Sequence, residues 1–318
     1  MAILIDFSQI FLAPIFVNSD AKECAGNPSS ESRDIIFHLV TNSIRSLVMK
    51  NKKAFGSDII IACDNGSWRY DEFPQYKWLR KQKRLEPQKD NINWKFVKAV
   101  MKESQDILQK FFPYAVISVP GAEGDDVIGV LTKHLSEDVV DKELDPFGNV
   151  FGTEPILIVS TDNDNTQLLK YKNVKQWSQG TRSFIKPPAN IRELMIEKFV
   201  RGEPGDGLPS IKCHDNWFVD YEKGRDRAPS ITKEYIKSFL AAKDPVDACL
   251  TEEEACRYRM NEKLISYDHI PENIYTNIIS VYNNEKEKLK THSKMGLMNF
   301  FVKNRMNNLL SKIGDFYP

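Results

Sequence analysis

The sequence predicts an α/β protein with a central, mostly parallel sheet and helices on both of its faces. Short apolar runs rich in β-branched residues, each as long as a buried strand, alternate in the first half with segments of helical periodicity. Strands that alternate with helices are typical of parallel sheets, because a parallel strand needs a long crossover connection. Acidic residues follow each of the apolar runs, and this second feature bears on function.

The predicted strands, in chain order, are residues 2–5, 59–63, 115–119 and 156–159. Apolar residues at helical spacing predict helices over residues 35–47 and 96–108, in the first two gaps between these strands. A third helix is predicted to begin near Asp125, because Glu123 and Asp125 can face one point only if Glu123 lies at or before the helix cap. This helix would bury Val127, Val130 and Leu131.

Carboxylates stand at the end of each predicted strand. Asp6 follows the first strand and Asp64 the second. The other acids are Glu123, Asp125 and Asp126 after the third strand, and Asp162 and Asp164 after the fourth. Ligands of parallel sheets bind beyond the carboxyl ends of the strands, so these side chains are predicted to converge. A single Asp after a strand is also a common helix cap or turn residue, but clustered carboxylates repel one another unless a cation neutralises them. The pattern therefore favours a metal site.

The donor chemistry indicates which metal. The acids offer only oxygen, and of the five histidines none lies beside an acidic motif except His214, near Asp215. Oxygen donors favour Mg²⁺ or Mn²⁺ over Zn²⁺. A calcium-binding EF-hand after Asp162 is excluded, because Gln167 stands where that loop needs Gly and Asn173 where it needs Glu. No phosphate-binding glycine motif occurs, so nucleotide-driven chemistry has no support.

A basic segment follows Asp64. Residues 76–84 carry five Lys or Arg side chains, two aromatic rings and no acid, and Arg69 precedes them. Such a run is also typical of a solvated helix face. Beside a metal cluster, the alternative is that the bases bind phosphates and the aromatics stack on nucleotides. A loop at residues 202–212, rich in Gly and Pro, contains one more Asp, Asp206; by itself it predicts a turn between helices.

The composition excludes several classes of protein. The 318 residues carry 44 Lys or Arg against 44 Asp or Glu and are 41% hydrophobic, which fits a globular chain of about two domains rather than a disordered tail or a fibre. The five cysteines lack the C-x2-C spacing of zinc sites, which favours reduced thiols. No apolar run is long enough to span a membrane and no signal-peptide pattern is present, so we expect a cytoplasmic protein without membrane contact.

Five motifs together resemble the flap endonuclease, or 5′-nuclease, superfamily, and within it the ribonuclease H group of T-even bacteriophages. They are I-D-F-S with Asp6, A-C-D-N with Asp64 followed by Arg69, Tyr76, Lys77 and Arg80, E-G-D-D from Glu123 to Asp126, S-T-D-N-D with Asp162 and Asp164, and G-E-P-G-D-G-L-P-S-I with Asp206. Residues 173–178 and 301–303 extend the likeness over nearly the whole chain. The sequence departs from the family at two positions: Glu203 occupies a position where the family usually has Asp, and Gly207 one where it usually has Asn.

The resemblance implies a PIN-like 5′-nuclease fold in two domains. Residues 1–185 would form a metal-dependent nuclease domain with a helical arch near residues 77–92. Residues 186–318 would form a smaller helical C-terminal DNA-binding domain with a helix-hairpin-helix-like element.

The resemblance also implies the roles of individual residues. Asp6, Asp64, Glu123, Asp125 and Asp162 would hold or face a first Mg²⁺ ion, and Asp164 and Asp206 a second, with Mn²⁺ as a substitute. The implied catalytic residues are Lys77, Arg69, Asp125 and Asp162. The implied nucleic-acid-binding residues are Arg69, Tyr76, Lys77, Arg80, Lys81, Lys83, Arg84 and Lys212. Among them, Lys77 would lie near the scissile phosphate and Tyr76 would stack on a nucleotide.

The implied function is that of a metal-dependent 5′ to 3′ exonuclease and flap endonuclease. It would act on RNA–DNA and DNA duplexes, including flaps, forks and nicks, and remove RNA primers during DNA replication by two-metal phosphodiester hydrolysis. The implied partners are a single-strand-binding protein and a sliding clamp, and the enzyme would be a monomer in the host cytoplasm if it comes from a phage. The alternative is a catalytically inactive DNA-structure-binding protein of the same fold.

Overall fold

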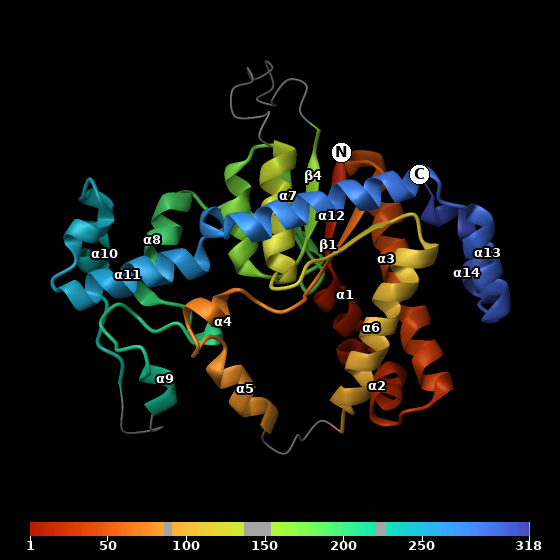
Figure 1. Ribbon diagram of the computed structural model, residues 1–318, viewed down its shortest axis with the longest axis horizontal. Coiled ribbons are helices and arrows are strands. Elements are labelled where there is room, and N and C mark those ends of the chain that lie inside the picture. Colours follow the sequence, from red (N-terminus) through yellow and green to blue (C-terminus); the bar gives the residue numbers. More distant parts are fainter. Residues whose placement is uncertain (86–90, 137–153, 221–226, 318) are drawn as a thin grey trace. The chain divides into compact units, whose positions relative to one another are not determined.

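The computed structural model describes residues 1–85, 91–136, 154–220 and 227–317 (Figure 1). It divides into two compact units. The first comprises Met1–Gly66, Asp90–Lys186 and Glu272–Pro318, and the second comprises Ser67–Lys89 and Pro187–Pro271. Part of the predicted arch, residues 86–90, and nearly all of the insert at residues 137–154, which the sequence predicts as a surface loop, lie outside the described residues.

The first unit is built on a six-stranded sheet of order β3-β2-β1-β4-β5-β6. The strands are β1 (Ala2–Asp6), β2 (Asp58–Cys63), β3 (Ala115–Ser118), β4 (Ile156–Val159), β5 (Val174–Ser178) and β6 (Ser183–Phe184). The first five run parallel, and β6 pairs antiparallel with β5. The predicted parallel sheet is therefore confirmed, and β5 and β6 extend it. The strand order reverses between β1 and β4, at the kind of switch point where parallel sheets bind ligands.

Helices cover both faces of this sheet (Figure 1). On one face, α1 (Phe7–Val17), α3 (Ser30–Phe55) and α6 (Trp94–Phe111) share a core with strand residues such as Ile5 and Ile61. Alternate residues of the same strands, such as Leu4 and Ile60, are also buried but outside that core. α7 (Gly124–Ser136) contacts β1, β2 and β3, and α12 (Glu272–Lys290) contacts β3 and α7. The interiors of β1 to β4 are thus apolar, and their polar residues stand at the strand ends.

The predicted helices of the first unit are present. Residues 35–47 lie in α3 and residues 96–108 in α6. α7 begins at Gly124, so Glu123 precedes the helix as expected, and Val127, Val130 and Leu131 are buried. The remaining elements are α2 (Ser19–Gly26), the 3₁₀ helix η2 (Asn163–Lys170), α13 (Lys294–Lys303), α14 (Asn307–Leu310) and the 3₁₀ helix η6 (Ile313–Phe316).

The second unit is helical over its described residues. Its elements are α4 (Arg69–Glu72), α5 (Trp78–Leu85), α8 (Ile191–Arg201), η3 (Pro204–Asp206), α9 (Trp217–Asp220), α10 (Lys233–Ala241), η4 (Pro245–Ala248), α11 (Glu252–Ile265) and η5 (Tyr267–His269). Phe199, Phe239 and Tyr258 form its centre, where the rings of Phe239 and Tyr258 stack with centroids 5.5 Å apart. Among the helices that the structure describes, none is long and apolar enough to cross a membrane.

This division differs from the predicted boundary at residue 185 in two places. Glu272–Pro318 packs with the first unit, because Leu297, Phe301 and Phe316 are buried in the same core as the sheet. Ser67–Lys89, which includes the base of the predicted arch, packs with the second unit. There the Lys263 amine pairs with the Glu72 carboxylate at 2.6 Å. In both cases, contacts with residues far away in the sequence determine the unit to which the segment belongs.

Candidate metal centre and basic segment

The acids after β1 and β2 are tied to the turns around them. Asp6 ends β1 and caps α1, where its carboxylate accepts a hydrogen bond of 3.2 Å from the Gln9 amide. Asp64 directly follows β2 and accepts from the Gly124 amide at 2.7 Å and from the Ser8 hydroxyl. Asp64 thereby links the chain after β1 to the start of α7. These bonds hold both acids at the carboxyl edge of the sheet.

The acids after β3 and β4 are held by caps of their own. The buried Asp126 carboxylate accepts from the Glu123 amide at 2.9 Å, which fixes the first turn of α7. Asp125 accepts a hydrogen bond of 2.9 Å from the Asn165 side-chain amide. Asp162 caps η2 by accepting from the Asp164 amide at 2.9 Å. The acid motifs after β3 and β4 therefore each begin a helical turn at this edge of the sheet.

The pKa values show that these carboxylates interact. Burial, together with the negative charges of Asp64 and Asp162, raises the pKa of Asp6 from 3.8 to about 7. Burial also raises the pKa of Asp125 well above its usual value, together with the charges of Asp6, Asp162 and Asp164. The structure therefore brings Asp6, Asp64, Asp125, Asp162 and Asp164 together, as the topology predicts.

The donor set fits a hard divalent cation. All five gathered side chains offer carboxylate oxygens, the ligands that Mg²⁺ and Mn²⁺ prefer, and their repulsion would be relieved by positive charge. Among the described residues, no three acidic, His or Cys side chains are as closely grouped as the ligands of one bound ion. The fit therefore rests on the chemistry and mutual repulsion of the carboxylates.

Asp206 lies in the second unit, where its contacts are with the basic segment. Its carboxylate pairs with the Arg80 guanidinium at 2.6 Å and accepts from the Tyr76 hydroxyl at 3.3 Å. Its backbone carbonyl accepts from the Lys77 amide at 2.7 Å. The Arg80 Nε also donates to the Gly205 carbonyl at 2.8 Å. The structure thus joins the loop at residues 202–212 to the base of α5.

Two of the predicted nucleic-acid-binding residues are buried in the structure. Tyr76 is 2% exposed and Arg69 is 3% exposed. The Arg69 Nε donates to the Leu264 carbonyl at 2.7 Å, and the Tyr76 hydroxyl is used by Asp206. The Tyr76 ring is therefore enclosed by the chain in this structure, and its stacking on a nucleotide stays a prediction. Both side chains support the basic segment from within.

The other bases of the segment are more accessible. Arg80, Lys81 and Lys83 are exposed, and the Lys81 amine lies 4.1 Å from the centroid of the Tyr70 ring. Lys77 is half-buried and adopts a left-handed backbone with φ 56°. The Lys212 amine lies 4.4 Å from the centroid of the Tyr235 ring. The Arg84 side chain lies outside the described residues.

The departure at Glu203 has a local explanation. Its carboxylate pairs with the Lys198 amine of α8 at 2.8 Å. Gly207 adopts a left-handed backbone with φ 75°, and a Cβ there would lie 2.9 Å from the Gln75 carbonyl oxygen. The loop can therefore approach the residues before α5 only with glycine at this position.

Buried amide and hydroxyl side chains beneath the acids were not predicted from the sequence. Gln9 donates to the Ser160 hydroxyl at 2.9 Å and accepts from the Thr161 amide at 2.6 Å. The Asn165 amide bridges Asp125 and the Ser160 hydroxyl, and Gln176 contacts the chain around Asp162. The position of Gln9 three residues after Asp6 is the one local signal that could have indicated this network.

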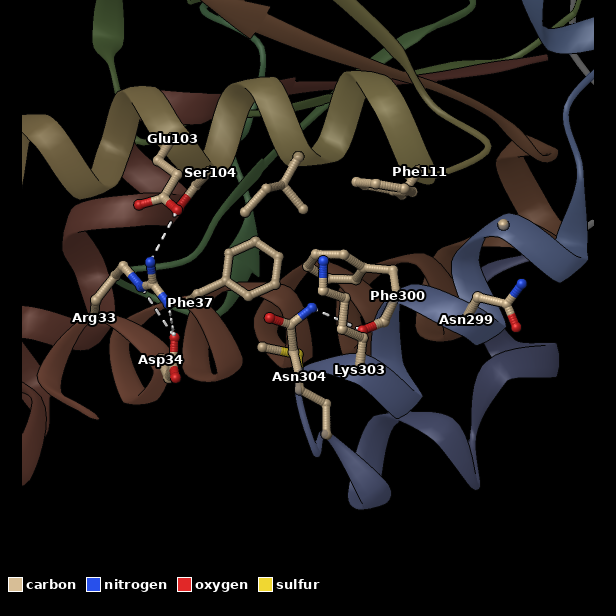
Figure 2. A pocket seen from close by; sticks show the side chains of 13 residues that line it. Arg33, Asp34, Phe37, Glu103, Ser104, Phe111, Asn299, Phe300, Lys303 and Asn304 are labelled. Carbon is tan, nitrogen blue, oxygen red and sulfur yellow. Dashed lines mark hydrogen bonds and ion pairs between the residues drawn. The ribbon is translucent and has the colours of Figure 1, made fainter. Parts of the chain in front are cut away.

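A pocket of different character lies elsewhere in the first unit (Figure 2). It has a volume of about 530 Å³ and lies among α3, α6 and the C-terminal helices, with Phe37, Phe111 and Phe300 in its wall. Its acids already have a cation beside them, because the Arg33 guanidinium pairs with Asp34 at 2.8 Å and with Glu103 at 3.2 Å. The aromatic wall and the paired acids do not fit a metal site.

Comparisons with known proteins agree with this geometry. The 5′-3′ exonuclease N-terminal resolvase-like domain matches residues 3–197, and the T4 RNase H C-terminal domain matches residues 190–316. The chain is 33% identical to the ribonuclease H of Enterobacteria phage T4 over 318 residues, covering 98% of this chain and 95% of the relative.

Solved structures share the fold. A complex of the bacteriophage T5 flap endonuclease with DNA and metal ions matches with a TM-score of 0.59 and 15% identity, over 91% of this chain and 99% of that one. The T5 5′-exonuclease with bound divalent zinc ions matches with a TM-score of 0.59 and 14% identity, over 91% of this chain and 100% of that one. The predicted fold class is therefore confirmed.

Proposed function

This chain belongs to the 5′-3′ exonuclease family and is a nuclease, and from this premise we propose that it is a divalent-metal-dependent 5′ to 3′ exonuclease and flap endonuclease. Its substrates would be RNA–DNA and DNA duplexes with flaps, forks or nicks. Its role would be the removal of RNA primers during DNA replication, as the ribonuclease H relationship suggests.

The observation that carries this proposal is the group of carboxylates at the sheet edge, where burial and the neighbouring negative charges raise the pKa of Asp6 and Asp125. Asp6, Asp64, Glu123, Asp125, Asp162 and Asp164 are the residues of the first unit that would hold Mg²⁺ or Mn²⁺. Two such ions, when bound, would supply an activated water and stabilise the attacking and leaving oxygens of phosphodiester hydrolysis. The carboxylates would hold these ions, and the positive charge of the ions would relieve the repulsion between the carboxylates.

The basic segment would bind the nucleic acid. The exposed Arg80, Lys81 and Lys83 offer positive charge to backbone phosphates. Lys77 would contact the phosphate that is cleaved, with its position set by the hydrogen bond between its amide and Asp206. Arg69 and Tyr76 would act as supports of this segment. Lys212, on the loop that carries Asp206, would add a further phosphate contact.

Asp206 poses a specific condition for the two-ion form of the proposal. Its carboxylate is already paired with Arg80 and hydrogen-bonded by Tyr76. For Asp206 to serve the second ion, the Arg80 guanidinium would have to leave it, and a substrate phosphate is the natural alternative partner for that guanidinium. Binding of substrate and completion of the second ion's ligand set would then be linked.

Cleavage of a 5′-flap DNA and of an RNA–DNA hybrid, each labelled at either end, tests the proposal. With Mg²⁺ we expect products that carry a 5′-phosphate, and with EDTA or in an Asp162→Asn variant we expect none. Product sizes from the two labels separate endonuclease from exonuclease activity. Binding of the flap without any cleavage in Mg²⁺ or Mn²⁺ would favour the alternative, a catalytically inactive DNA-structure-binding protein.

The remaining proposals concern partners. We infer a monomer that contacts a single-strand-binding protein and a sliding clamp, in line with a replication nuclease. Sedimentation of the chain alone and with each purified partner would check all three points.

A further inference from the structure

Gln176 is a buried side chain whose contacts bear on the acids after β4. It lies in the middle of β5, opposite Ile158 of β4, and its exposed fraction is 0%. Its Nε2 donates to the Ser160 carbonyl at 3.0 Å and to the Asp162 carbonyl at 2.7 Å. Both hydrogens of one amide nitrogen are therefore used on either side of Thr161.

These two hydrogen bonds lie where the backbone pairing of β4 with β5 ends. The Ser160 amide still donates to the Trp177 carbonyl at 3.2 Å, which continues the pairing of β4 with β5. Beyond it the chain turns away toward Asp162 and η2. Buried carbonyls need a hydrogen-bond donor, and at Ser160 and Asp162 the Gln176 side chain provides one in place of a strand.

The contacts also restrict which side chain can do this. The opposite amide orientation would set the Gln176 oxygen against two carbonyl oxygens, so the acceptors themselves fix the orientation. Glu would offer oxygens at the same place, Met would offer no donor, and Asn is one carbon shorter. Because the carbonyls on both sides of Thr161 are fixed, the backbone that presents Asp162 is fixed as well.

The hydroxyl of Ser160 strengthens this arrangement from the other side. It accepts from the Asp162 amide at 3.1 Å, from Gln9 at 2.9 Å and from Asn165 at 3.2 Å. Asn165 in turn holds Asp125. A shift of the backbone at Ser160 would therefore reach the acids of two strands.

We propose that Gln176 is a positioning residue that holds the segment of residues 160–162 so that Asp162 and its neighbours can bind divalent cations. This inference rests on the proposed function. Outer partners that fix the groups carrying metal ligands typically change metal affinity by roughly 10- to 100-fold when they are removed. The role of Gln176 is accordingly in cation affinity and not in contact with the substrate.

The test is binding of Mn²⁺ to the full chain without nucleic acid, measured by titration calorimetry or electron paramagnetic resonance. The variant is Gln176→Met, which keeps the length of the side chain and removes its donors. Asn51→Leu is the matched control, since the Asn51 amide is buried and donates to the Leu47 carbonyl at 2.9 Å near the end of α3, at the opposite edge of the sheet. Melting temperatures in EDTA compare the folding of the two variants.

We expect Gln176→Met to raise the dissociation constant for Mn²⁺ roughly tenfold or more, and Asn51→Leu to leave it within about twofold of the starting chain. Gln176→Glu should weaken Mn²⁺ binding in the same direction as Gln176→Met. Unchanged affinity in Gln176→Met, or equal weakening in Asn51→Leu, would overturn the inference. A Gln176→Met chain that fails to fold in EDTA while Asn51→Leu folds would also overturn it, because the amide would then serve the fold itself. If the unaltered chain binds no Mn²⁺, the proposed function fails instead.

Discussion

The acids at the sheet edge and the acid in the loop of the second unit have opposite surroundings. The charges that perturb Asp6 and Asp125 are those of other carboxylates, Asp64, Asp162 and Asp164 among them. Asp206 instead has Arg80 and Tyr76 at hydrogen-bond distance. A divalent cation would therefore encounter clustered negative charge at the sheet edge, but an existing ion pair at Asp206. The neighbours of a carboxylate, more than its place in a motif, determine how readily a metal ion binds it.

The difference has an energetic consequence. At the sheet edge, a divalent cation would relieve repulsion that the folded chain carries without it. At Asp206, a cation would compete with a guanidinium and displace an existing ion pair. Because the Arg80 side chain is 51% exposed, that pair is screened by water and weak enough to exchange. The first region should therefore bind metal before the second.

The largest expected effect comes from neutralising one sheet-edge acid. Asp125→Asn keeps the shape and the acceptor for Asn165 but removes one charge of the group. Cleavage in Mg²⁺ should fall by roughly 10³-fold or more, since several kcal/mol of metal-derived stabilisation are lost. The measurement is the single-turnover rate on a labelled 5′-flap.

The same variant should be more stable than the starting chain in EDTA. At neutral pH the unfolded chain ionises this carboxyl at no cost, whereas the folded chain must ionise it in a buried position, beside Asp6 and Asp162, or take up a proton. Removing that cost should raise the melting temperature by about 2 °C or more. Asp34→Asn, at an acid paired with Arg33 in the aromatic pocket, is the control and should retain full cleavage. A lower melting temperature for Asp125→Asn would break the comparison between the two regions.

A smaller effect is expected at Lys77 in the second unit. Lys77→Ala removes the amine, and loss of one charged contact to the reacting phosphate should slow single-turnover cleavage by roughly 10²-fold. The dissociation constant for the flap should rise by a much smaller factor, because other bases of the segment still bind phosphates. Equal losses in rate and binding would reassign Lys77 to plain phosphate affinity.

Comparing Lys77→Gly with Lys77→Ala separates the effect of losing the amine from the effect of the left-handed backbone. Lys77 has φ 56°, a left-handed conformation that costs L-residues about 1–2 kcal/mol and glycine very little. Lys77→Gly should therefore cleave as slowly as Lys77→Ala but unfold at a higher denaturant concentration. Faster cleavage by the glycine variant would show that backbone strain, and not the amine, limits the reaction.

The sequence was sufficient for the sheet-edge acids and insufficient for their supports. Asp6 and Asp64 follow short β-branched runs, and the topology of parallel sheets places such strand ends together. Gln176 lies in a strand that the apolar pattern did not predict, and its partners are backbone carbonyls, which leave no trace in the sequence. In the sequence, a tyrosine beside Lys and Arg residues, such as Tyr76, does not reveal whether its ring faces a nucleotide or the protein. Its hydroxyl bonds to Asp206, which lies 130 residues away in the chain.

The smallest expected effect tests how the loop meets the basic segment. Gly207→Ala places a Cβ 2.9 Å from the Gln75 carbonyl oxygen and 3.3 Å from the Lys77 amide nitrogen, at a backbone φ of 75°. The left-handed conformation alone should cost about 1–2 kcal/mol of unfolding free energy, and the hydrogen bond from Lys77 to Asp206 should open more often. Hydrogen exchange at the Lys77 amide measures this opening, and cleavage should slow only by a few-fold because the amine is retained.

Gly205→Ala is the matched control for this loop. A Cβ at Gly205 meets only the Arg80 guanidinium at 3.8 Å, an ordinary contact distance. Exchange at Lys77 should therefore be unchanged in Gly205→Ala and faster in Gly207→Ala. If the two variants behave alike, the close approach at Gly207 does not hold the basic segment. The pairing of Asp206 with Arg80 would then rest on its two charges alone, and salt should release it from both variants equally.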